Sequence, residues 1–245
     1  MSDASKPLAA QVAVVTGAGR GIGRAVALAY ARAGASIVCS ARSQVEIEET
    51  AALIRNEGGQ ASAFVADVTD LTAVTALCEH AAAQYNGIDI VVGNAGIGGQ
   101  ARKVADSDPA RWAQTIQVNL IGAYHTAHAA IPHLRARGAG KIIFVGSGTR
   151  HGANPGMSPY VCSKAALWKL TQILGLELAE FNISINELIP GPVKTAMTGF
   201  GKQQFPAGEW AKEPEDLIPL AMFLATQPPI GPTAQSFSLM RRAGH

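Results

Sequence analysis

The chain has 245 residues, of which 48% are hydrophobic and 16% are charged. This composition supplies one sizeable core, so we expect residues 1–245 to form a single domain. The net charge is only +2 without a basic run, which argues against nucleic acid and membrane surfaces as partners. The polar start, the scattered cysteines and the lack of an apolar run near ~20 residues predict a cytoplasmic protein.

Short apolar segments alternate with longer helix-like segments along the chain. We predict strands at Val12–Thr16, Ser36–Ser40, Ala61–Ala66, Ile88–Gly93, Lys141–Gly146, Ile183–Ile189 and Gln235–Leu239. The helices between and after them are expected at Ile22–Ala33, Gln44–Asn56, Leu71–Tyr85, Arg111–Arg137, Tyr160–Phe181 and Leu217–Thr226. Strands that are apolar throughout are typical of a parallel sheet buried on both faces. The pattern predicts an α/β fold: a Rossmann-like, doubly wound parallel sheet with helices on both faces.

A glycine-rich turn, Thr16–Gly23, separates the first predicted strand from the first predicted helix, which is the context of a dinucleotide site. Glycine is needed there because a side chain would hold a pyrophosphate away from the backbone and the helix N-terminus. We therefore expect a dinucleotide to bind at Gly17, Gly19, Arg20, Gly21, Ile22 and Gly23.

Six motifs in this order resemble those of the short-chain dehydrogenase/reductase family. They are Thr16–Gly23, Asn94-Ala95-Gly96, Asn119, Ser147, Tyr160-x-x-x-Lys164 and Pro190-Gly191-Pro192-Val193-x-Thr195. Each motif alone is weak, but the ordered set is specific, and the resemblance covers essentially the whole chain. It implies an oxidoreductase that interconverts a small-molecule carbonyl and an alcohol. It also implies a homotetramer or homodimer, assembled through the helices Arg111–Arg137 and Tyr160–Phe181.

The end of the second strand indicates which dinucleotide is used. NAD enzymes usually have an Asp or Glu there, which holds the ribose diol, whereas this chain has Ser40-Ala41-Arg42. An arginine matches the oxygens of a 2′-phosphate, which a carboxylate would repel. Arg20 can approach the same phosphate from the glycine turn. We predict NADP(H), bound at Ser40 and Arg42. An NAD-dependent secondary-alcohol dehydrogenase is the alternative, in which Arg42 is a solvated residue at a helix start.

The family resemblance implies the remaining cofactor contacts. Asp67, followed by Val68, would bond the adenine amino group. The alternative role of Asp67 is a helix N-cap, which Thr69 or Asp70 could supply equally well. The small residues around Asn94, Ala95 and Gly96 would let the adenosine ribose pass. The nicotinamide end would be held by Tyr160, Lys164, Pro190, Gly191, Val193 and Thr195.

Tyr160 and Lys164 are four residues apart, so a helix places them on one face. An ammonium beside a phenol lowers the phenol's pKa from about 10, which suits Tyr160 to act as general acid and base. Ser147 closes the fifth strand, where its hydroxyl can bond the substrate oxygen. The resemblance adds Asn119, which would interrupt its helix so that its carbonyl holds a water that relays protons to Lys164.

The loop after Ser147 and the segment Gly191–Trp210, a candidate lid, are expected to meet the substrate. The predicted substrate residues are Thr149, His151, Met157 and Met197. Arg150 lies in the same loop, and we expect its side chain to be exposed. The spacing of the histidines does not frame a metal site, so no metal is predicted.

Two departures from the family pattern stand out. The family often has a serine where this chain has Gly146, and it often has Asp-Gly-Gly after the last strand, where this chain has other residues. A protein that binds NADP without turnover is a further alternative. Such a sensor would have a broken catalytic set, whereas this chain retains every member.

Overall fold

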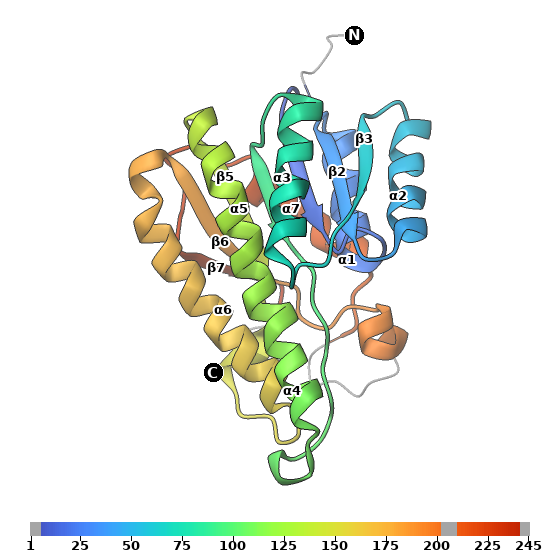
Figure 1. Ribbon diagram of the computed structural model, residues 1–245, viewed down its shortest axis with the longest axis vertical. Helices are drawn as coiled ribbons and strands as arrows, with labels where there is room; N and C mark the ends of the chain where they lie inside the picture. The colour runs from blue at the N-terminus through green and yellow to red at the C-terminus, as the bar shows by residue number, and fades with distance from the viewer. Residues whose placement is uncertain (1–5, 202–209, 241–245) are drawn as a thin grey trace.

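The computed structural model describes residues 6–201 and 210–240. Within these ranges, seven parallel strands form one sheet in the order β3-β2-β1-β4-β5-β6-β7 (Figure 1). The strands are β1 (Val12–Thr16), β2 (Ser36–Ala41), β3 (Ala61–Val65), β4 (Ile90–Gly93), β5 (Gly140–Val145), β6 (Ile183–Ile189) and β7 (Gln235–Ser238). The chain begins at the centre of the sheet, extends to one edge, and then returns to build the other half. This is the predicted doubly wound topology.

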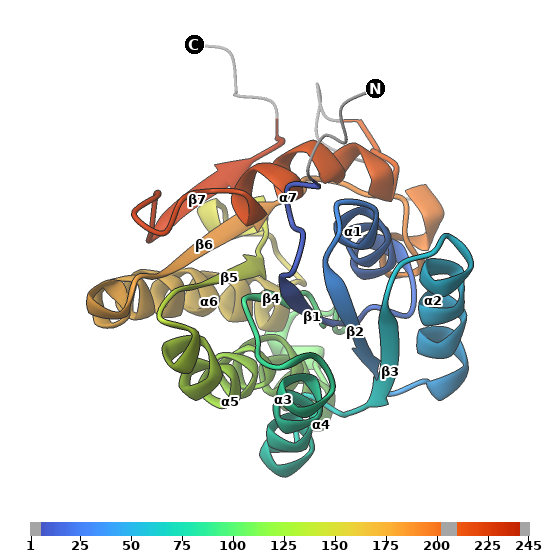
Figure 2. The same ribbon diagram turned by 90° about the horizontal axis from the view of Figure 1, so that it is seen from above.

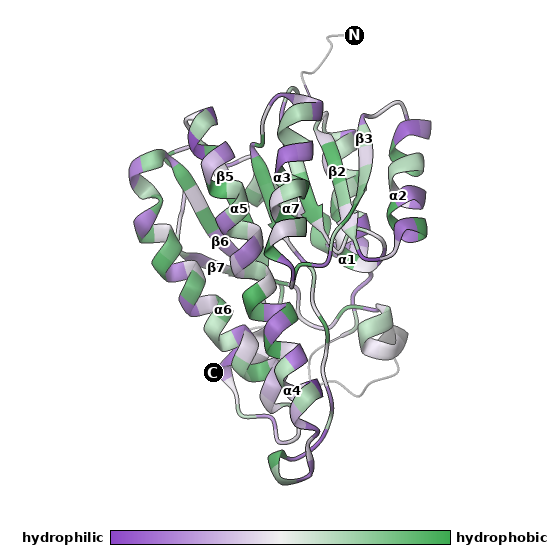
Figure 3. Ribbon diagram, viewed as in Figure 1, coloured by the Kyte–Doolittle hydropathy of each residue, from purple (hydrophilic) through white to green (hydrophobic). Residues whose placement is uncertain are grey.

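Helices cover both faces of the sheet (Figure 2). They are α1 (Gly21–Arg32), α2 (Gln44–Asn56), α3 (Leu71–Tyr85), α4 (Pro109–Ile116), α5 (Gly122–Arg137), α6 (Ser158–Glu177) and α7 (Ile218–Ala225). Buried residues of α1, α2 and α7 pack on one face, and those of α3, α5 and α6 pack on the other. The central strands β1, β4 and β5 are mostly hydrophobic, whereas the helices carry hydrophobic and hydrophilic residues in turn (Figure 3). The expected two-sided burial is confirmed for the five inner strands, whereas the edge strands β3 and β7 are partly exposed.

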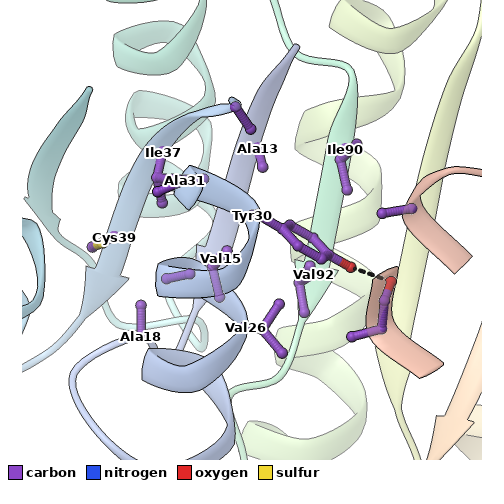
Figure 4. Packing of buried hydrophobic residues seen from close by; sticks show 14 of the residues in the cluster. Ala13, Val15, Ala18, Val26, Tyr30, Ala31, Ile37, Cys39, Ile90 and Val92 are labelled. Atoms are coloured by element: carbon purple, nitrogen blue, oxygen red, sulfur yellow. Dashed lines mark hydrogen bonds between the residues drawn. The ribbon is translucent and has the colours of Figure 1, made fainter. Parts of the chain in front are cut away.

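The core between α1, α7 and the sheet contains the side chain of Tyr30, an aromatic ring with a polar hydroxyl. Tyr30 has no exposed surface, and its hydroxyl donates to the carbonyl oxygen of Ala221 at 2.8 Å (Figure 4). Burial without that bond would leave the hydroxyl unsatisfied, at a cost of about 1–3 kcal/mol. The bond ties α1, which follows the glycine turn, to α7 near the other end of the chain.

The predicted long helix Arg111–Arg137 is divided in the structure. α4 ends at Ile116, a π-helical turn spans Gln117–Ile121, and α5 continues from Gly122. Asn119 lies within this π-helical turn, so the interruption that the family resemblance implies at this residue is present. Turns of this kind are frequent at functional sites.

The carboxyl ends of the parallel strands meet at one edge of the sheet. The glycine turn follows β1, Asn94 follows β4, Ser147 comes soon after β5, and Pro190 follows β6. Motifs that are far apart in the sequence therefore converge on this edge, where ligands of open α/β sheets bind. Among the described helices, none is long and apolar enough to cross a membrane.

Candidate active site

The glycine turn is a tight backbone structure. Gly17 and Gly21 adopt positive φ angles of 66° and 55°, which favour glycine. A Cβ atom on Gly23 would overlap the carbonyl of Gly17, so this glycine lets α1 approach the turn. The N-cap residue of α1, Arg20, makes no side-chain capping hydrogen bond. This start of α1 is suited to an anion such as a pyrophosphate.

Asn94 braces the turn from the end of β4. Its side-chain amide donates to the carbonyls of Thr16 at 2.9 Å and Gly17 at 3.2 Å. Its backbone N–H donates to the Thr16 hydroxyl at 3.1 Å. The sequence assigned Asn94 to the passage of the ribose, but the structure gives it the further task of holding the glycine turn in shape.

A cleft of about 560 Å³ opens beside the turn. The predicted cofactor residues that line it are Gly17, Gly19, Arg20, Ile22, Arg42, Asp67, Val68, Asn94, Ala95, Gly96 and Thr195, together with the predicted substrate residue Met197. Predicted cofactor residues outside this lining are Gly21, Gly23, Ser40, Tyr160, Lys164, Pro190, Gly191 and Val193. Ser40 is buried within β2, with 1% of its surface exposed. Its side chain is therefore not part of the cleft surface.

Some lining residues were missed by the sequence reasoning. They are Ala41, Ser43, Glu46, Ala66, Ile97, Gly98, Val118 and Ala196. Most adjoin a predicted motif, so extending each motif by one or two residues would have found them. Glu46 had a separate signal, because Ser43 caps α2 by accepting the N–H of Glu46. Ser-x-x-Glu is a helix-start pattern that places the glutamate in the first turn, beside the cleft.

Both arginines of the predicted phosphate site lie beside a carboxylate. Arg20 Nη1 is 3.1 Å from Glu46 Oε1, and Arg42 Nη1 is 3.9 Å from Asp67 Oδ2. The two arginine side chains are 67% and 64% exposed. Exposed ion pairs contribute about 0–1 kcal/mol, so a bound anion can compete for either guanidinium.

The N-cap of α3 is Asp70, so Asp67 does not have the alternative role of capping this helix.

Ser147, Tyr160 and Lys164 come together at the carboxyl end of β5. Lys164 reaches back from α6 so that its Nζ donates to the Val145 carbonyl at 2.7 Å. The same Nζ lies 5.9 Å from the centre of the Tyr160 ring. The Ser147 hydroxyl is near enough to Tyr160 to lower the pKa of its phenol. The predicted serine, tyrosine and lysine therefore form one cluster.

Burial dominates the ionisation of this cluster. Burial raises the pKa of Tyr160, and the Ser147 side chain lowers that pKa by less. This differs from the lowered pKa that we expected from a neighbouring ammonium, because the loss of water around the phenolate outweighs the other effects in the protein alone. Burial also lowers the pKa of Lys164 to about 8, against an opposing effect of the Glu187 carboxylate.

Asn119 links the cluster to the cleft. Its side chain is 1% exposed and accepts the Ile97 N–H at 2.8 Å while donating to the Ile97 carbonyl at 2.9 Å. It also donates to Ser163 Oγ at 3.1 Å, and Ser163 donates to the Tyr160 carbonyl at 2.7 Å. The side chain of Asn119 is thus fully engaged, and its carbonyl belongs to the π-helical turn.

The segment after β6 is held by backbone bonds. Val193 forms a β-bridge with Lys212. The Lys212 N–H donates to the Pro192 carbonyl at 3.0 Å, and the Lys212 carbonyl accepts from the Lys194 N–H at 2.8 Å. Thr195 lies next to the glycine turn: a Cβ atom added to Gly21 would be 3.1 Å from the Thr195 Cγ2. This position supports the expected role of Thr195 at the cofactor. Residues 202–209 of the candidate lid lie outside the described part of the chain.

The predicted substrate residues are dispersed. Thr149 Oγ1 is 2.9 Å from Ser147 Oγ, so it touches the catalytic cluster. His151 is exposed, Met157 is partly buried, and Met197 is 46% exposed on the cleft. The expectation that Arg150 is exposed is wrong. Only 7% of its side-chain surface is exposed, because it forms an ion pair of 2.9 Å with the buried Glu187.

Comparison with known proteins agrees with this geometry. Residues 11–204 match the family described as short chain dehydrogenase. The chain belongs to the short-chain dehydrogenase family. Its members among curated proteins include "Dehydrogenase/reductase SDR family member 4" from Homo sapiens, 33% identical over 90% of this chain and 83% of that protein.

Solved structures of the family superpose over nearly the whole chain. A short-chain type dehydrogenase/reductase from Mycobacterium marinum has a TM-score of 0.89 and 31% identity, with 96% of each chain covered. A 3-ketoacyl-ACP reductase from Sinorhizobium meliloti has a TM-score of 0.85 and 35% identity, with 93% of this chain and 96% of that chain covered. Membership in the family makes this chain an oxidoreductase with a nicotinamide dinucleotide cofactor and a small-molecule substrate.

Proposed function

We propose that the protein is an NADP(H)-dependent oxidoreductase that interconverts an alcohol and a carbonyl of the ketone, aldehyde or 3-oxoacyl type, with Tyr160 as general acid and base. One observation carries the proposal: Ser147, Tyr160 and Lys164 converge at the same strand edge as the cleft beside the glycine turn. The intact cluster argues against a sensor that binds NADP without turnover.

Each residue of the cluster has a separate task. When bound, the cofactor supplies or accepts the hydride. In reduction, the Tyr160 hydroxyl gives its proton to the substrate oxygen, and in oxidation it takes that proton back. The Ser147 hydroxyl donates a hydrogen bond to the oxygen as negative charge builds there. The Lys164 ammonium stabilises the phenolate that remains after proton transfer.

The preference for NADP(H) is supported by Arg20 and Arg42 on the cleft and by the lack of a carboxylate in Ser40–Arg42. Two carboxylates nearby, Glu46 and Asp67, compete for these arginines. Because both pairs are exposed and weak, they reduce the preference without removing it. An NAD-linked alcohol dehydrogenase is the second candidate.

The deciding experiment is a panel of ketones, aldehydes, 3-oxoacyl thioesters and secondary alcohols, followed by the absorbance of the reduced cofactor. Parallel assays use NADPH and NADH, or their oxidised forms for the alcohols. We expect turnover of at least one carbonyl, with a higher kcat/KM for NADPH. Turnover with NADH alone would overturn the cofactor assignment, and no turnover with any pair would overturn the enzymatic one.

We also propose that residues 1–245 act as one domain and assemble into a homotetramer or homodimer through the faces of α5 and α6. Exposed apolar side chains on these helices support it: Tyr124 is 44% exposed, Ile173 45% and Leu176 79%. Light scattering on the purified protein tests the assembly, and a monomer at all concentrations would contradict it.

A further inference from the structure

A buried carboxylate stands behind the catalytic cluster. Glu187 lies in β6 with no exposed surface, opposite Phe144 of β5 and Ser236 of β7. A charge in such a place is costly unless it is paired and hydrogen-bonded. The neighbouring residues of β6 are mostly apolar, so the glutamate is not explained by the packing of the strand.

Arg150 supplies the partner. Its Nη2 and Nε lie 2.9 and 3.1 Å from Glu187 Oε2, and Nη2 also donates to Ser236 Oγ at 2.9 Å. The Ser236 hydroxyl in turn donates to Glu187 Oε2 at 2.8 Å, and the guanidinium carbon lies 4.5 Å from the centre of the Trp168 ring. Arg150 belongs to the 3-10 turn Gly148–His151, which directly follows Ser147. The turn after the catalytic serine is therefore tied to β6, β7 and α6 through one side chain.

Gly146 makes room for this arrangement. A Cβ atom on Gly146 would overlap the second carboxylate oxygen of Glu187, which has no hydrogen-bond partner among the described residues. The backbone at Gly146 joins Val145, whose carbonyl accepts the Lys164 ammonium, to Ser147. The carboxylate thus lies against the short segment that connects two members of the cluster.

We propose that Glu187 and Arg150 are positioning residues. Their ion pair fixes the turn that follows Ser147. The Glu187 carboxylate occupies the space left by the missing side chain of Gly146, and it places a negative charge near Lys164. The proposal rests on the proposed function of the Ser147–Tyr160–Lys164 cluster. The titratable or charged groups around Lys164 in the described chain are Tyr160 on its own helix, Glu187 from β6 and, bonded to Glu187, Arg150 from the turn. Glu187 favours the ammonium form of Lys164.

The first test needs no substrate. The full chain, labelled with ¹³C at lysine Cε, is titrated by NMR, and the Lys164 signal is identified by its loss in Lys164→Met. We expect Glu187→Gln, which keeps the shape but removes the charge, to lower the titration midpoint of Lys164 by about one pH unit. An unchanged midpoint would overturn the electrostatic half of the proposal.

Asp89→Asn is the matched control. Asp89 pairs with Arg137 at 2.8 Å, next to the amino end of β4. Burial lowers the pKa of Lys141, and the Asp89 carboxylate opposes that effect. This substitution should lower the midpoint of Lys141 and leave that of Lys164 unchanged. If the titration midpoint of Lys164 shifted equally in Glu187→Gln and Asp89→Asn, the loss of any carboxylate would change it. That result would contradict a specific role of Glu187.

The second test measures positioning through kcat, with NADPH and the best carbonyl of the panel. We expect Glu187→Gln and Arg150→Met to lower kcat by roughly tenfold to a hundredfold, as a displaced catalytic group does, while the Kd of NADPH changes by less than about twofold. Arg150→Lys, which keeps the positive charge, should recover part of the loss. Equal losses in kcat and NADPH affinity would indicate general disruption and overturn the proposal.

A double-variant cycle tests the space at Gly146. Gly146→Ser should lower kcat in the wild-type background but cause no further loss when Glu187→Ala is already present, because the overlapping carboxylate is gone. Equal losses in the two backgrounds would show that Gly146 and Glu187 do not act together. If the wild-type protein turns over no carbonyl, the proposed function fails, and the lysine titration still decides whether Glu187 acts on Lys164.

Discussion

The two halves of the site use arginine–glutamate pairs in opposite ways. At the adenosine end, the side chains of Arg20 and Glu46 are 67% and 34% exposed, whereas those of Arg150 and Glu187 behind the catalytic serine are 7% and 0% exposed. An exposed pair contributes about 0–1 kcal/mol, but removing one partner of a buried pair costs about 3–5 kcal/mol. The exposed pair can therefore exchange one partner for a ligand, while the buried pair is part of the framework.

Burial separates the two ends further. Water reaches the charged groups of the adenosine end, while the lysine of the catalytic end is almost fully covered and has a shifted pKa. Substitutions at the catalytic end should therefore change chemistry and stability strongly. Those at the adenosine end should change cofactor choice by smaller amounts and leave the fold intact.

The largest effect is expected at the catalytic end from Tyr160→Phe. Removing the hydroxyl should lower kcat by about 10²–10⁴-fold because the proton donor is lost, while the Kd of NADPH stays nearly unchanged. Steady-state assays and fluorescence titration measure the two quantities. Tyr85→Phe, at the last residue of α3 and outside the cleft lining, is the control and should retain activity. Substantial turnover by Tyr160→Phe would refute the assigned acid.

Lys164→Met tests the energetic cost of the buried ammonium. Below pH 8 the folded protein must bury a charged lysine, since its pKa is lowered from 10.5 to about 8. The variant should therefore be about 1–3 kcal/mol more stable than wild type at pH 7, while losing activity. Chemical unfolding measures the free energy.

The pH dependence of that difference has a definite sign. Between pH 8 and 10.5 the unfolded chain binds the proton that the folded chain has released, so wild-type stability gains with rising pH and the advantage of Lys164→Met disappears. Lys169→Met, at an exposed position of the same helix, should show no such advantage. A variant that is less stable than wild type at pH 7 would show that the bond from Lys164 to Val145 outweighs the burial cost.

Arg42→Asp tests the adenosine end. We expect the ratio of kcat/KM for NADPH to that for NADH to fall by about tenfold or more, because a phosphate partner is replaced by a like charge. The melting temperature should not change, since the side chain is 64% exposed. Arg32→Asp, at the far end of α1, controls for the change of net charge. An unchanged ratio would remove Arg42 from the phosphate site.

The smallest effect is expected from Glu46→Gln. Releasing Arg20 from its exposed partner should tighten NADPH binding by about two- to fivefold, in keeping with the small free energy of such pairs, and should leave NADH binding unchanged. Fluorescence titration at low and high salt measures both. Equal tightening for NADPH and NADH would mean that Glu46 acts on the common part of the cofactor.

Much of the site followed from the sequence because its signals are local. Alternating apolar strands and helices predicted the sheet, and the rule that parallel strands end at one edge brought the glycine turn, Ser147 and Tyr160 to the same place. Asn119 was flagged by its polar amide within an apolar helix. Glu187 carried a comparable signal, a charge within the apolar strand Ile183–Ile189, which was overlooked.

Other features were decided only by the tertiary structure. The contact between Glu187 and Gly146 depends on the register of β5 and β6, and the burial of Arg150 depends on a partner that is remote in sequence. The direction of the Tyr160 pKa shift likewise depends on how much water the surrounding elements exclude. Sequence periodicity reports which face of an element is apolar, and motifs report local backbone geometry. Neither reports which side chains from distant segments share one buried space, because that is set when the layers pack.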